Sequence, residues 1–359
     1  MKILIITNHS YMLYRFRREL IAELQKAHEV ILSMPFVGHE EDFQAMGLRC
    51  INTDVDRRGI NPKTDLKLIK AYRKLLKTER PDMVITYSIK PNIYAGLLCG
   101  MTGIPFCANI QGLGTAFQRK GLAEFVTVLY RAAMKKAKAV FFENEGNARE
   151  FIDRKILTRK KITVLPGAGI NLERYPLVPY PENDRVHFLY LGRIMKEKGI
   201  DELFAAMRRL HSELGDRVVL DLVGFFDDDY EAQVNQLVED GIAVFHGFQT
   251  EPTPYYAAAD CVVLPSYHEG LSNVLLEAAA IGRPVITSDI HGCKEPVDNG
   301  VSGLLCRVKD ADDLYRKMRQ MVDLTPSERE QMGLAARHKV EQEFEKHMVV
   351  QKTIDAVLK

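Results

Sequence analysis

The chain has 359 residues, of which 46% are hydrophobic and 27% charged, and this composition is typical of a globular protein with two domains. No segment approaches the ~20 apolar residues of a membrane span, and the apolar run at residues 3–7 is too short for a signal peptide. The six cysteines are scattered without a CxxC pair, which indicates buried thiols in a reducing cytoplasm.

The net charge of +1 conceals a division between the two halves of the chain. Residues 1–180 contain 29 Lys and Arg against 17 Asp and Glu, a balance of +12, whereas residues 181–359 contain 20 against 31, a balance of −11. The basic half favours an anionic partner, and no nucleic-acid-binding motif accompanies the charge. Its clusters alternate with apolar residues on predicted helices, which suits an anionic membrane surface, although solvated helix faces without a partner remain an alternative. These clusters are residues 15–18, 57–58, 67–77 and 135–136.

The first half alternates predicted strands and helices, as expected for a doubly wound parallel sheet in an α/β domain. His9 follows the strand at residues 1–6, and Lys90 follows the strand at residues 83–86. Such sheets bind ligands at the carboxyl ends of their strands, so His9 could reach a cleft between the domains and Lys90 could meet a diphosphate group. The alternatives are a histidine on the polar surface and a lysine that caps a loop.

A glycine-rich turn follows the predicted strand at residues 106–110. It contains Gln111, Gly112 and Gly114 but lacks the third glycine of a dinucleotide fingerprint, so a Rossmann cofactor site is not expected. The glycines instead let the backbone approach a substrate. The only passage rich in both proline and glycine, residues 166–181, marks the domain boundary.

The most informative stretch is a predicted strand, turn and helix at residues 261–281. Gly270 occupies the sharp turn, Ser272 or Asn273 is a good N-cap, and a helix N-terminus attracts phosphate. From residue 274 to 281 every side chain is apolar or alanine except Glu277, which predicts a buried helix whose carboxylate needs a partner. Glu269 and Glu277 could bracket a sugar nucleotide. Alternatively, Glu277 pairs with an arginine and Glu269 is a solvated loop residue.

The Glu269-x7-Glu277 spacing, with Gly270 between, resembles the signature of glycosyltransferase family 4. The resemblance implies the GT-B fold, in which two Rossmann-like doubly wound domains face across a cleft, and transfer with retention of the donor's anomeric configuration. It further implies that Glu269 contacts donor-sugar hydroxyls and that Glu277 holds the ribose. The backbone amides of the turn would bind the donor as well, and they belong to Gly270, Leu271, Ser272, Asn273 and Val274.

A second match to this family begins after the predicted strand at residues 186–191, with Gly192 and Arg193 and then Lys198. In the family the arginine and the lysine clamp the diphosphate, a role that suits a guanidinium fork beside an ammonium group. The resemblance also implies that Phe248 contacts the nucleobase. The aspartate run at residues 227–229 is predicted to be a solvated helix start, as is usual for consecutive loop carboxylates, and no metal-ligand spacing accompanies it.

We expect an acceptor- and membrane-facing domain at residues 1–180 and a donor domain at 181–340, and the resemblance implies a last helix at 341–359 that crosses back to the first domain. Two departures from the family are visible. The loop with His9 lacks a glycine-rich turn, and Gln111 stands where many members have histidine. The Gln-Gly-Leu-Gly-Thr version resembles a subset that builds bacterial surface polysaccharides and lipid-linked oligosaccharides, including transferases of N-acetylgalactosamine to undecaprenyl-diphosphate-linked sugars.

We therefore expect a metal-independent, cofactor-free retaining transferase that is cytoplasmic and peripheral on the inner face of the cell membrane. It would move a hexose or N-acetylhexosamine from a UDP-sugar to a lipid-diphosphate-linked saccharide, without binding nucleic acid. Arg193, Lys198 and Glu269 are the predicted catalytic residues. The predicted acceptor or cleft residues are His9, Lys90, Gln111, Gly112 and Gly114. A sugar-nucleotide epimerase of the same fold and a non-catalytic nucleotide-sugar-binding partner of an assembly complex are the alternatives.

Overall fold

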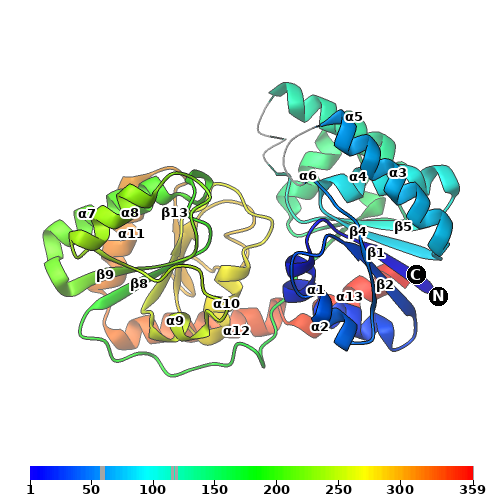
Figure 1. Ribbon diagram of the computed structural model, residues 1–359. Helices are drawn as coiled ribbons and strands as arrows, with labels where there is room; N and C mark the ends of the chain where they lie inside the picture. The colour runs from blue at the N-terminus through cyan, green and yellow to red at the C-terminus, as the bar shows by residue number, and fades with distance from the viewer. Residues whose placement is uncertain (57–60, 115–116, 118–119, 359) are drawn as a thin grey trace. The chain divides into compact units, whose positions relative to one another are not determined.

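The computed structural model describes residues 1–56, 61–114, 117 and 120–358 (Figure 1). The chain divides into two compact units, one formed by Met1–Gly169 with His347–Lys359 and the other by Ile170–Lys346. Each unit contains one parallel sheet covered by helices, so the predicted pair of Rossmann-like α/β domains is confirmed.

The first unit has a seven-stranded sheet in the order β3-β2-β1-β4-β5-β6-β7. The chain order reverses between β1 and β4, which makes the carboxyl ends of these strands the switch point of the sheet. The strands β1, β4 and β5 consist almost entirely of buried apolar residues, because helices cover both faces. The strands are β1 (Lys2–Ile6), β2 (Glu29–Met34), β3 (Arg49–Asn52), β4 (Met83–Tyr87), β5 (Phe106–Ile110), β6 (Ala139–Phe142) and β7 (Ile162–Val164).

The helices of the first unit include one from the end of the chain. Val349, Val350 and Val357 of α13 pack into the same core as Leu13 and Leu20 of α1. The helices are α1 (Ser10–Gln25), α2 (Glu40–Ala45), α3 (Pro62–Glu79), α4 (Ile89–Thr102), α5 (Lys120–Met134), α6 (Glu145–Asp153), the 3₁₀ helix η2 (Arg159–Lys161) and α13 (Lys346–Leu358).

The second unit has a six-stranded sheet in the order β10-β9-β8-β11-β12-β13. Its strands are β8 (Val186–Leu191), β9 (Val218–Val223), β10 (Ala243–Phe245), β11 (Cys261–Leu264), β12 (Val285–Ser288) and β13 (Gly303–Cys306). Its helices are η3 (Lys196–Lys198), α7 (Ile200–Leu214), η4 (Gly215–Arg217), α8 (Glu231–Glu239), α9 (Thr253–Ala258), α10 (Asn273–Ile281), α11 (Ala311–Asp323) and α12 (Pro326–Glu343).

The segment between the two sheets is bound to the second unit. The Ile170 N–H donates to the Phe344 carbonyl at 2.8 Å, and the Tyr180 hydroxyl donates to the Asp260 carbonyl at 2.9 Å. These bonds explain why the change of unit comes after Gly169, whereas the sequence placed the boundary at residue 180. The return to the first unit comes at His347, later than the predicted residue 341, because the Lys346 N–H still donates to Ile170.

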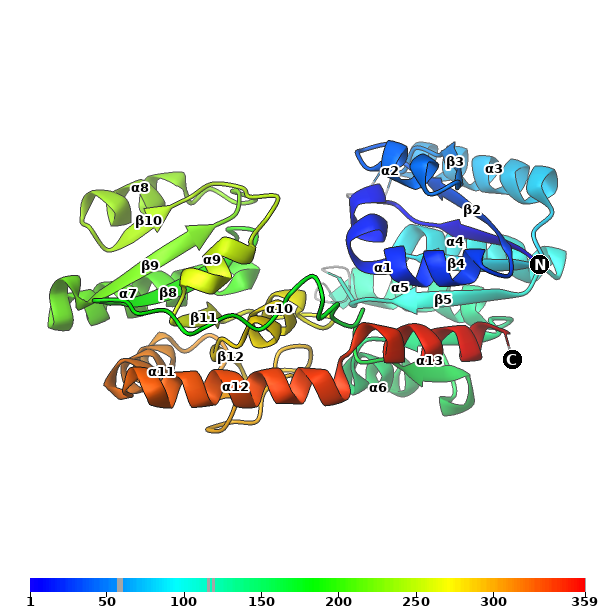
Figure 2. The same ribbon diagram turned by 90° about the horizontal axis from the view of Figure 1, so that it is seen from below.

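The helix α12 lies alongside α10 and supports it from below in the view of Figure 2. The contact is close at Gly333, where an added Cβ atom would lie 2.1 Å from the carbonyl oxygen of Gly282. Gly282 ends α10 with a φ of +86°. A glycine at position 333 is therefore required for α12 to reach the end of α10.

We predict that Gly333→Ala lowers the free energy of unfolding by about 1–3 kcal/mol, because the added methyl group forces the two helices apart. Denaturation followed by circular dichroism would measure the change. Gly121→Ala is the matched control, since Gly121 is a helical glycine with no atom within 4 Å of the added Cβ, and it should leave stability unchanged or raise it by about 0.5–1 kcal/mol. Equal stabilities of the Gly333→Ala and native proteins would contradict the prediction.

Candidate active site

The helix α10 begins at the carboxyl end of β11, as the sequence predicted. The Ser272 side chain caps it by accepting a hydrogen bond from the Leu275 N–H at 3.4 Å. Every residue from Leu275 to Ile281 is buried, which confirms the helix expected from the apolar run. The preceding turn packs tightly on its neighbour, since the Ser272 N–H donates to the Gly292 carbonyl at 2.8 Å. An added Cβ at Gly292 would lie 2.6 Å from the Gly270 carbonyl oxygen, so this turn is fixed by backbone contacts.

Glu277 is the only charged side chain on α10, and 4% of it is exposed. Its Oε2 atom accepts a hydrogen bond of 2.9 Å from the hydroxyl of Tyr256 on α9, a residue that is completely buried. The alternative interpretation of the sequence paired Glu277 with an arginine. The donor of this hydrogen bond is a neutral tyrosine. A neutral donor satisfies an oxygen of the carboxylate and leaves its charge in place.

Glu269 binds Lys198, which lies 71 residues earlier in the chain. The Lys198 Nζ atom is 2.6 Å from Oε1 of Glu269, and the Ser266 hydroxyl donates to the same oxygen at 2.9 Å. The side chains of Lys198 and Glu269 are 18% and 14% exposed, so Glu269 is not the solvated loop residue of the alternative interpretation. Gly199 makes the approach possible, because its φ is +73° and an added Cβ would lie 2.1 Å from the Pro265 carbonyl oxygen.

Arg193 lies at the carboxyl end of β8, directly after Gly192. Its Nη1 atom donates to Oδ2 of Asp227 at 2.6 Å, and the side chains are 48% and 13% exposed. The prediction that residues 227–229 form a solvated helix start is therefore wrong for Asp227. The helix α8 begins only at Glu231, and Asp227 is mostly buried because it binds the arginine.

Phe248, the predicted nucleobase contact, follows β10 and is 54% exposed. Its ring meets that of Phe225 edge to face, with centroids 5.9 Å apart. These two rings lie at the ends of the neighbouring strands β9 and β10, and Arg193 lies at the end of β8 on the other side of β9. The second unit thus brings cations, exposed aromatic rings and a helix N-terminus to the carboxyl edge of one sheet.

Sequence reasoning missed a cluster of one carboxylate and two histidines in the same sheet. Asp221 of β9 binds His187 Nδ1 and His246 Nε2, each at 2.8 Å, and the three residues come from neighbouring strands or strand ends. Burial opposes the charge of Asp221, but the hydrogen bonds from both histidines hold the pKa of its carboxyl below the usual value. The cluster ties the end of β10, and hence the loop with Phe248, to the centre of the sheet. Only the strand order, which the sequence does not state, could have revealed it.

The predicted acceptor residues of the first unit lie at the ends of β1, β4 and β5. His9 precedes α1, its backbone N–H donates to Thr7 Oγ1 at 3.4 Å, and the Gln111 side chain donates to Met12 Sδ at 3.3 Å. Lys90 is less available than predicted, because its Nζ atom forms a mostly buried ion pair with Asp65 of α3 at 2.8 Å.

The glycine-rich turn of the first unit is partly described. Gly112 is half-buried, and Gly114 has a φ of +69° and lies against the side chain of Ile89. Thr115 and Ala116 of the same turn lie outside the described residues, as do Arg57 and Arg58 of the basic clusters.

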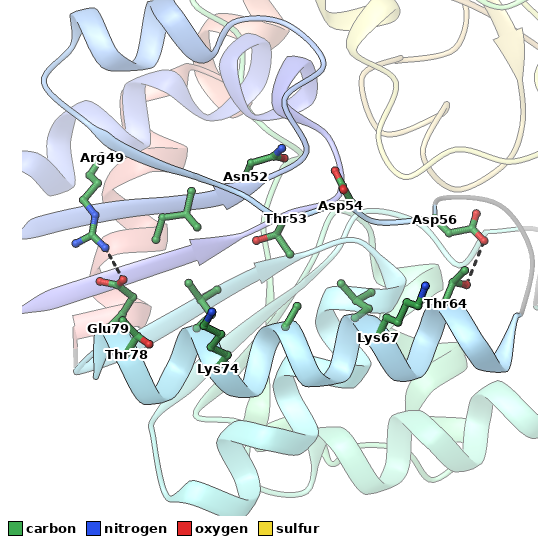
Figure 3. A pocket seen from close by; sticks show the side chains of 14 residues that line it. Arg49, Asn52, Thr53, Asp54, Asp56, Thr64, Lys67, Lys74, Thr78 and Glu79 are labelled. Carbon is green, nitrogen blue, oxygen red and sulfur yellow. Dashed lines mark hydrogen bonds and ion pairs between the residues drawn. The ribbon is translucent and has the colours of Figure 1, made fainter.

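A groove of about 730 Å³ lies between β3 and α3 of the first unit (Figure 3). Leu68 and Leu75 give it an apolar lining, and Lys67 and Lys74 of the same helix line it as well. An ion pair between Arg49 and Glu79 closes one end. The sequence identified the lysines of α3 but not the groove, because the groove depends on the position of the edge strand β3.

No helix in the described part of the chain is long and apolar enough to cross a membrane. Within the same residues, no group of three or more His, Cys, Asp or Glu side chains is placed to hold a metal ion. All six cysteines are free, and Cys50 is the least buried of them. Burial raises the pKa of the Cys99 thiol to about 12.

Two family models match the chain and together cover both units. The model described as glycosyl transferases group 1 matches residues 185–323, and the model described as glycosyl transferase 4-like matches residues 2–144. The first match contains Arg193, Lys198, Glu269 and Glu277, and the second contains His9, Lys90 and Gln111.

Two of the curated relatives match over most of their length. The N,N'-diacetylbacillosaminyl-diphospho-undecaprenol alpha-1,3-N-acetylgalactosaminyltransferase of Campylobacter jejuni is 28% identical over 342 residues, which are 90% of each chain. The capsular polysaccharide biosynthesis glycosyltransferase CapM of Staphylococcus aureus is 27% identical over 309 residues, covering 82% of this chain and 80% of CapM.

Solved structures match the whole chain. HepE of Anabaena in complex with UDP has a TM-score of 0.81 at 16% identity and covers 100% of both chains. WaaG, a glycosyltransferase of lipopolysaccharide biosynthesis, has a TM-score of 0.79 at 18% identity and covers 99% of both chains. The chain is therefore a glycosyltransferase with two matched domains, described by the 4-like model in the first unit and by the group 1 model in the second, and it has the GT-B fold.

Proposed function

We propose that this glycosyltransferase moves a hexose or N-acetylhexosamine from a UDP-sugar to a lipid-diphosphate-linked saccharide, with retention of the anomeric configuration. The observation that carries the proposal is the ion pair of Lys198 with Glu269 beside the capped start of α10. It places a cation and a carboxylate beside a helix N-terminus. A leaving diphosphate and a sugar that carries hydroxyls need these groups side by side.

The relatives support the donor and acceptor classes. The name of the Campylobacter jejuni relative describes a sugar transferred to a diphospho-undecaprenol-linked saccharide. An Escherichia coli relative, 26% identical over 290 residues and covered to 73% of its length, is named UDP-Gal:alpha-D-GlcNAc-diphosphoundecaprenol alpha-1,3-galactosyltransferase. HepE, which shares the fold, binds UDP and UDP-glucose.

In the proposed reaction the bond between C1 of the sugar and the β-phosphate oxygen breaks, and UDP leaves. Arg193, Lys198 and the backbone N–H groups at the start of α10 would neutralise its growing charge, so we propose that no divalent metal is needed. The acceptor hydroxyl oxygen then bonds to C1 on the same face. Its proton passes to the β-phosphate of the departing UDP, so no protein base is required.

The remaining donor contacts are proposed from the same geometry. Glu269, held by Lys198 and Ser266, would accept hydrogen bonds from the sugar hydroxyls, and Glu277 would accept them from the ribose. The exposed ring of Phe248 offers a face for the base.

The first unit is proposed to bind the acceptor and an anionic membrane surface, which would make the protein peripheral on the inner face of the cell membrane. Its helix α3 exposes a stripe of six basic residues and no exposed acidic residue, and α5 exposes the apolar side chains of Phe125 and Val128. Such faces suit a negatively charged lipid surface. The basic residues are Lys63, Lys67, Lys70, Arg73, Lys74 and Lys77. His9, Gln111, Gly112 and Gly114 are retained as acceptor contacts, whereas Lys90 would first have to leave Asp65.

We predict that UDP and UDP-sugars raise the melting temperature of the protein, because a ligand that binds only the folded state stabilises it by about 2.7 kcal/mol at 100 times its Kd. A panel with guanosine, adenosine and cytidine diphosphates separates the nucleotide classes. Glu277→Gln keeps an acceptor for Tyr256 but loses the charge, and it should respond less to UDP. The proposal fails if no nucleotide shifts the melting temperature.

We predict that Lys198→Ala lowers kcat by about 10²–10³-fold, because the departing diphosphate loses a cation that is already in position. Transfer of a radiolabelled sugar to a synthetic lipid-diphosphate disaccharide measures kcat. The same assay in EDTA tests whether the reaction needs a metal. NMR of the product reports the anomeric configuration. Lys196→Ala is the matched control, since Lys196 belongs to the same 3₁₀ helix and its side chain is 69% exposed. Equal activities of the two variants, both folded at the assay temperature, would remove Lys198 from the mechanism.

We predict that Lys70→Glu with Arg73→Glu weakens binding to anionic vesicles by at least about tenfold, since each basic residue near such a surface contributes about 1 kcal/mol. Co-sedimentation with vesicles that contain anionic lipids measures binding, and neutral vesicles of phosphatidylcholine alone give the background. Arg185→Glu with Arg217→Glu changes the net charge equally at exposed positions of the second unit and serves as the control. Equal losses in both double variants would show a general charge effect instead of a membrane-binding face.

A further inference from the structure

The backbone around Arg193 is bound to the loop that follows β9. The Gly192 N–H donates to the Val223 carbonyl at 2.9 Å, and the Ile194 N–H donates to the Phe225 carbonyl at 2.8 Å. Gly224 allows this contact, because an added Cβ there would lie 1.8 Å from the Gly192 carbonyl oxygen. Backbone hydrogen bonds therefore join the two strand ends on both sides of Arg193.

The peptide groups of Arg193 and Asp227 are held from several sides. The Tyr190 hydroxyl donates to the Arg193 carbonyl at 2.5 Å, and the Asp227 N–H donates to the Ile194 carbonyl at 3.1 Å. Asp227 thus has a fixed backbone directly beside the arginine. The side chain of Asp227 is 13% exposed, whereas that of Arg193 is 48% exposed.

The next residue of the aspartate run binds the backbone at the start of the 3₁₀ helix η3. Oδ2 of Asp228 accepts a hydrogen bond of 2.9 Å from the Lys196 N–H, at the start of the 3₁₀ helix that ends in Lys198. Asp229 is exposed and carries no such bond. The three neighbouring carboxylates therefore differ in position, and only the first binds a side chain of the donor site.

We propose that Asp227 is a positioning residue for the transferase reaction, which holds the Arg193 guanidinium ready for the donor diphosphate; the inference rests on the proposed function. Arginine is among the side chains with the largest rotamer entropy, so a free Arg193 would have to be ordered during each turnover. The bond to Asp227 uses one of the five guanidinium N–H donors and leaves the others for phosphate oxygens. A group that is oriented beforehand stabilises the transition state without further reorganisation.

The experiment compares Asp227→Asn with native protein and with Asp229→Asn, which removes a neighbouring charge that binds nothing in the site. Asp227→Asn is expected to lower kcat by about 10–100-fold, the size of effect that a small misplacement of a catalytic group produces. The Kd for UDP, measured by calorimetry, should change by less than about threefold, because a freed guanidinium still reaches a bound diphosphate. Asp227→Glu should recover part of the loss, and the melting temperature of every variant shows that it is folded.

A double-mutant cycle with Arg193→Ala separates positioning from a structural role. In the Arg193→Ala background, the further change Asp227→Asn should cause no additional loss of kcat, measured over hours with enzyme in excess. If Asp227→Asn lowers kcat in the Arg193→Ala background as much as it does in the native background, the inference is overturned. It is also overturned if Asp227→Asn has the native kcat while Arg193→Ala is slow. A native kcat for Arg193→Ala overturns both the inference and the proposed role of Arg193.

Discussion

The donor half of the candidate site depends on the ion pair between Lys198 and Glu269. It joins the turn after β8 to the turn before α10, two segments that the sequence separates by 71 residues. Removing one partner of a mostly buried pair leaves an uncompensated charge, which costs about 3–5 kcal/mol in fully buried cases. The pair is thus a constraint on the fold as well as a source of charge. A substrate that carries both phosphate and hydroxyl groups can share it, because the ammonium group has three N–H donors and the carboxylate accepts several hydrogen bonds.

Backbone packing makes that ion pair geometrically possible. Gly199 contacts Pro265, and Gly292 contacts the peptide groups of Glu269 and Gly270, at distances that no side chain would allow. The charged residues therefore extend from backbone segments that contact each other directly. This arrangement preorganises the site before any ligand arrives.

Predictions from the sequence were accurate where the structure of a segment depends on residues close to one another in the chain. The buried helix α10, its Ser272 cap and the two parallel sheets follow from apolar runs, capping residues and alternation of elements. The hydrogen bond from Tyr256 to Glu277 did not follow, because Tyr256 lies on another helix and resembles an ordinary core tyrosine in the sequence. Asp227 was misjudged for the same reason, since a run of aspartates does not show which one meets an arginine 34 residues away.

The first unit consists of two separate segments of the chain, and this has a consequence for its synthesis on the ribosome. Its core is completed by α13, which contributes Val349, Val350 and Val357, so residues 1–169 emerge long before their last packing partner exists. Domains made of one continuous segment can fold as soon as they leave the exit tunnel. Here the core of the first unit is complete only after all of the second unit has been translated. An exposed apolar strip beside α1 during that interval would make the nascent chain a natural client of chaperones.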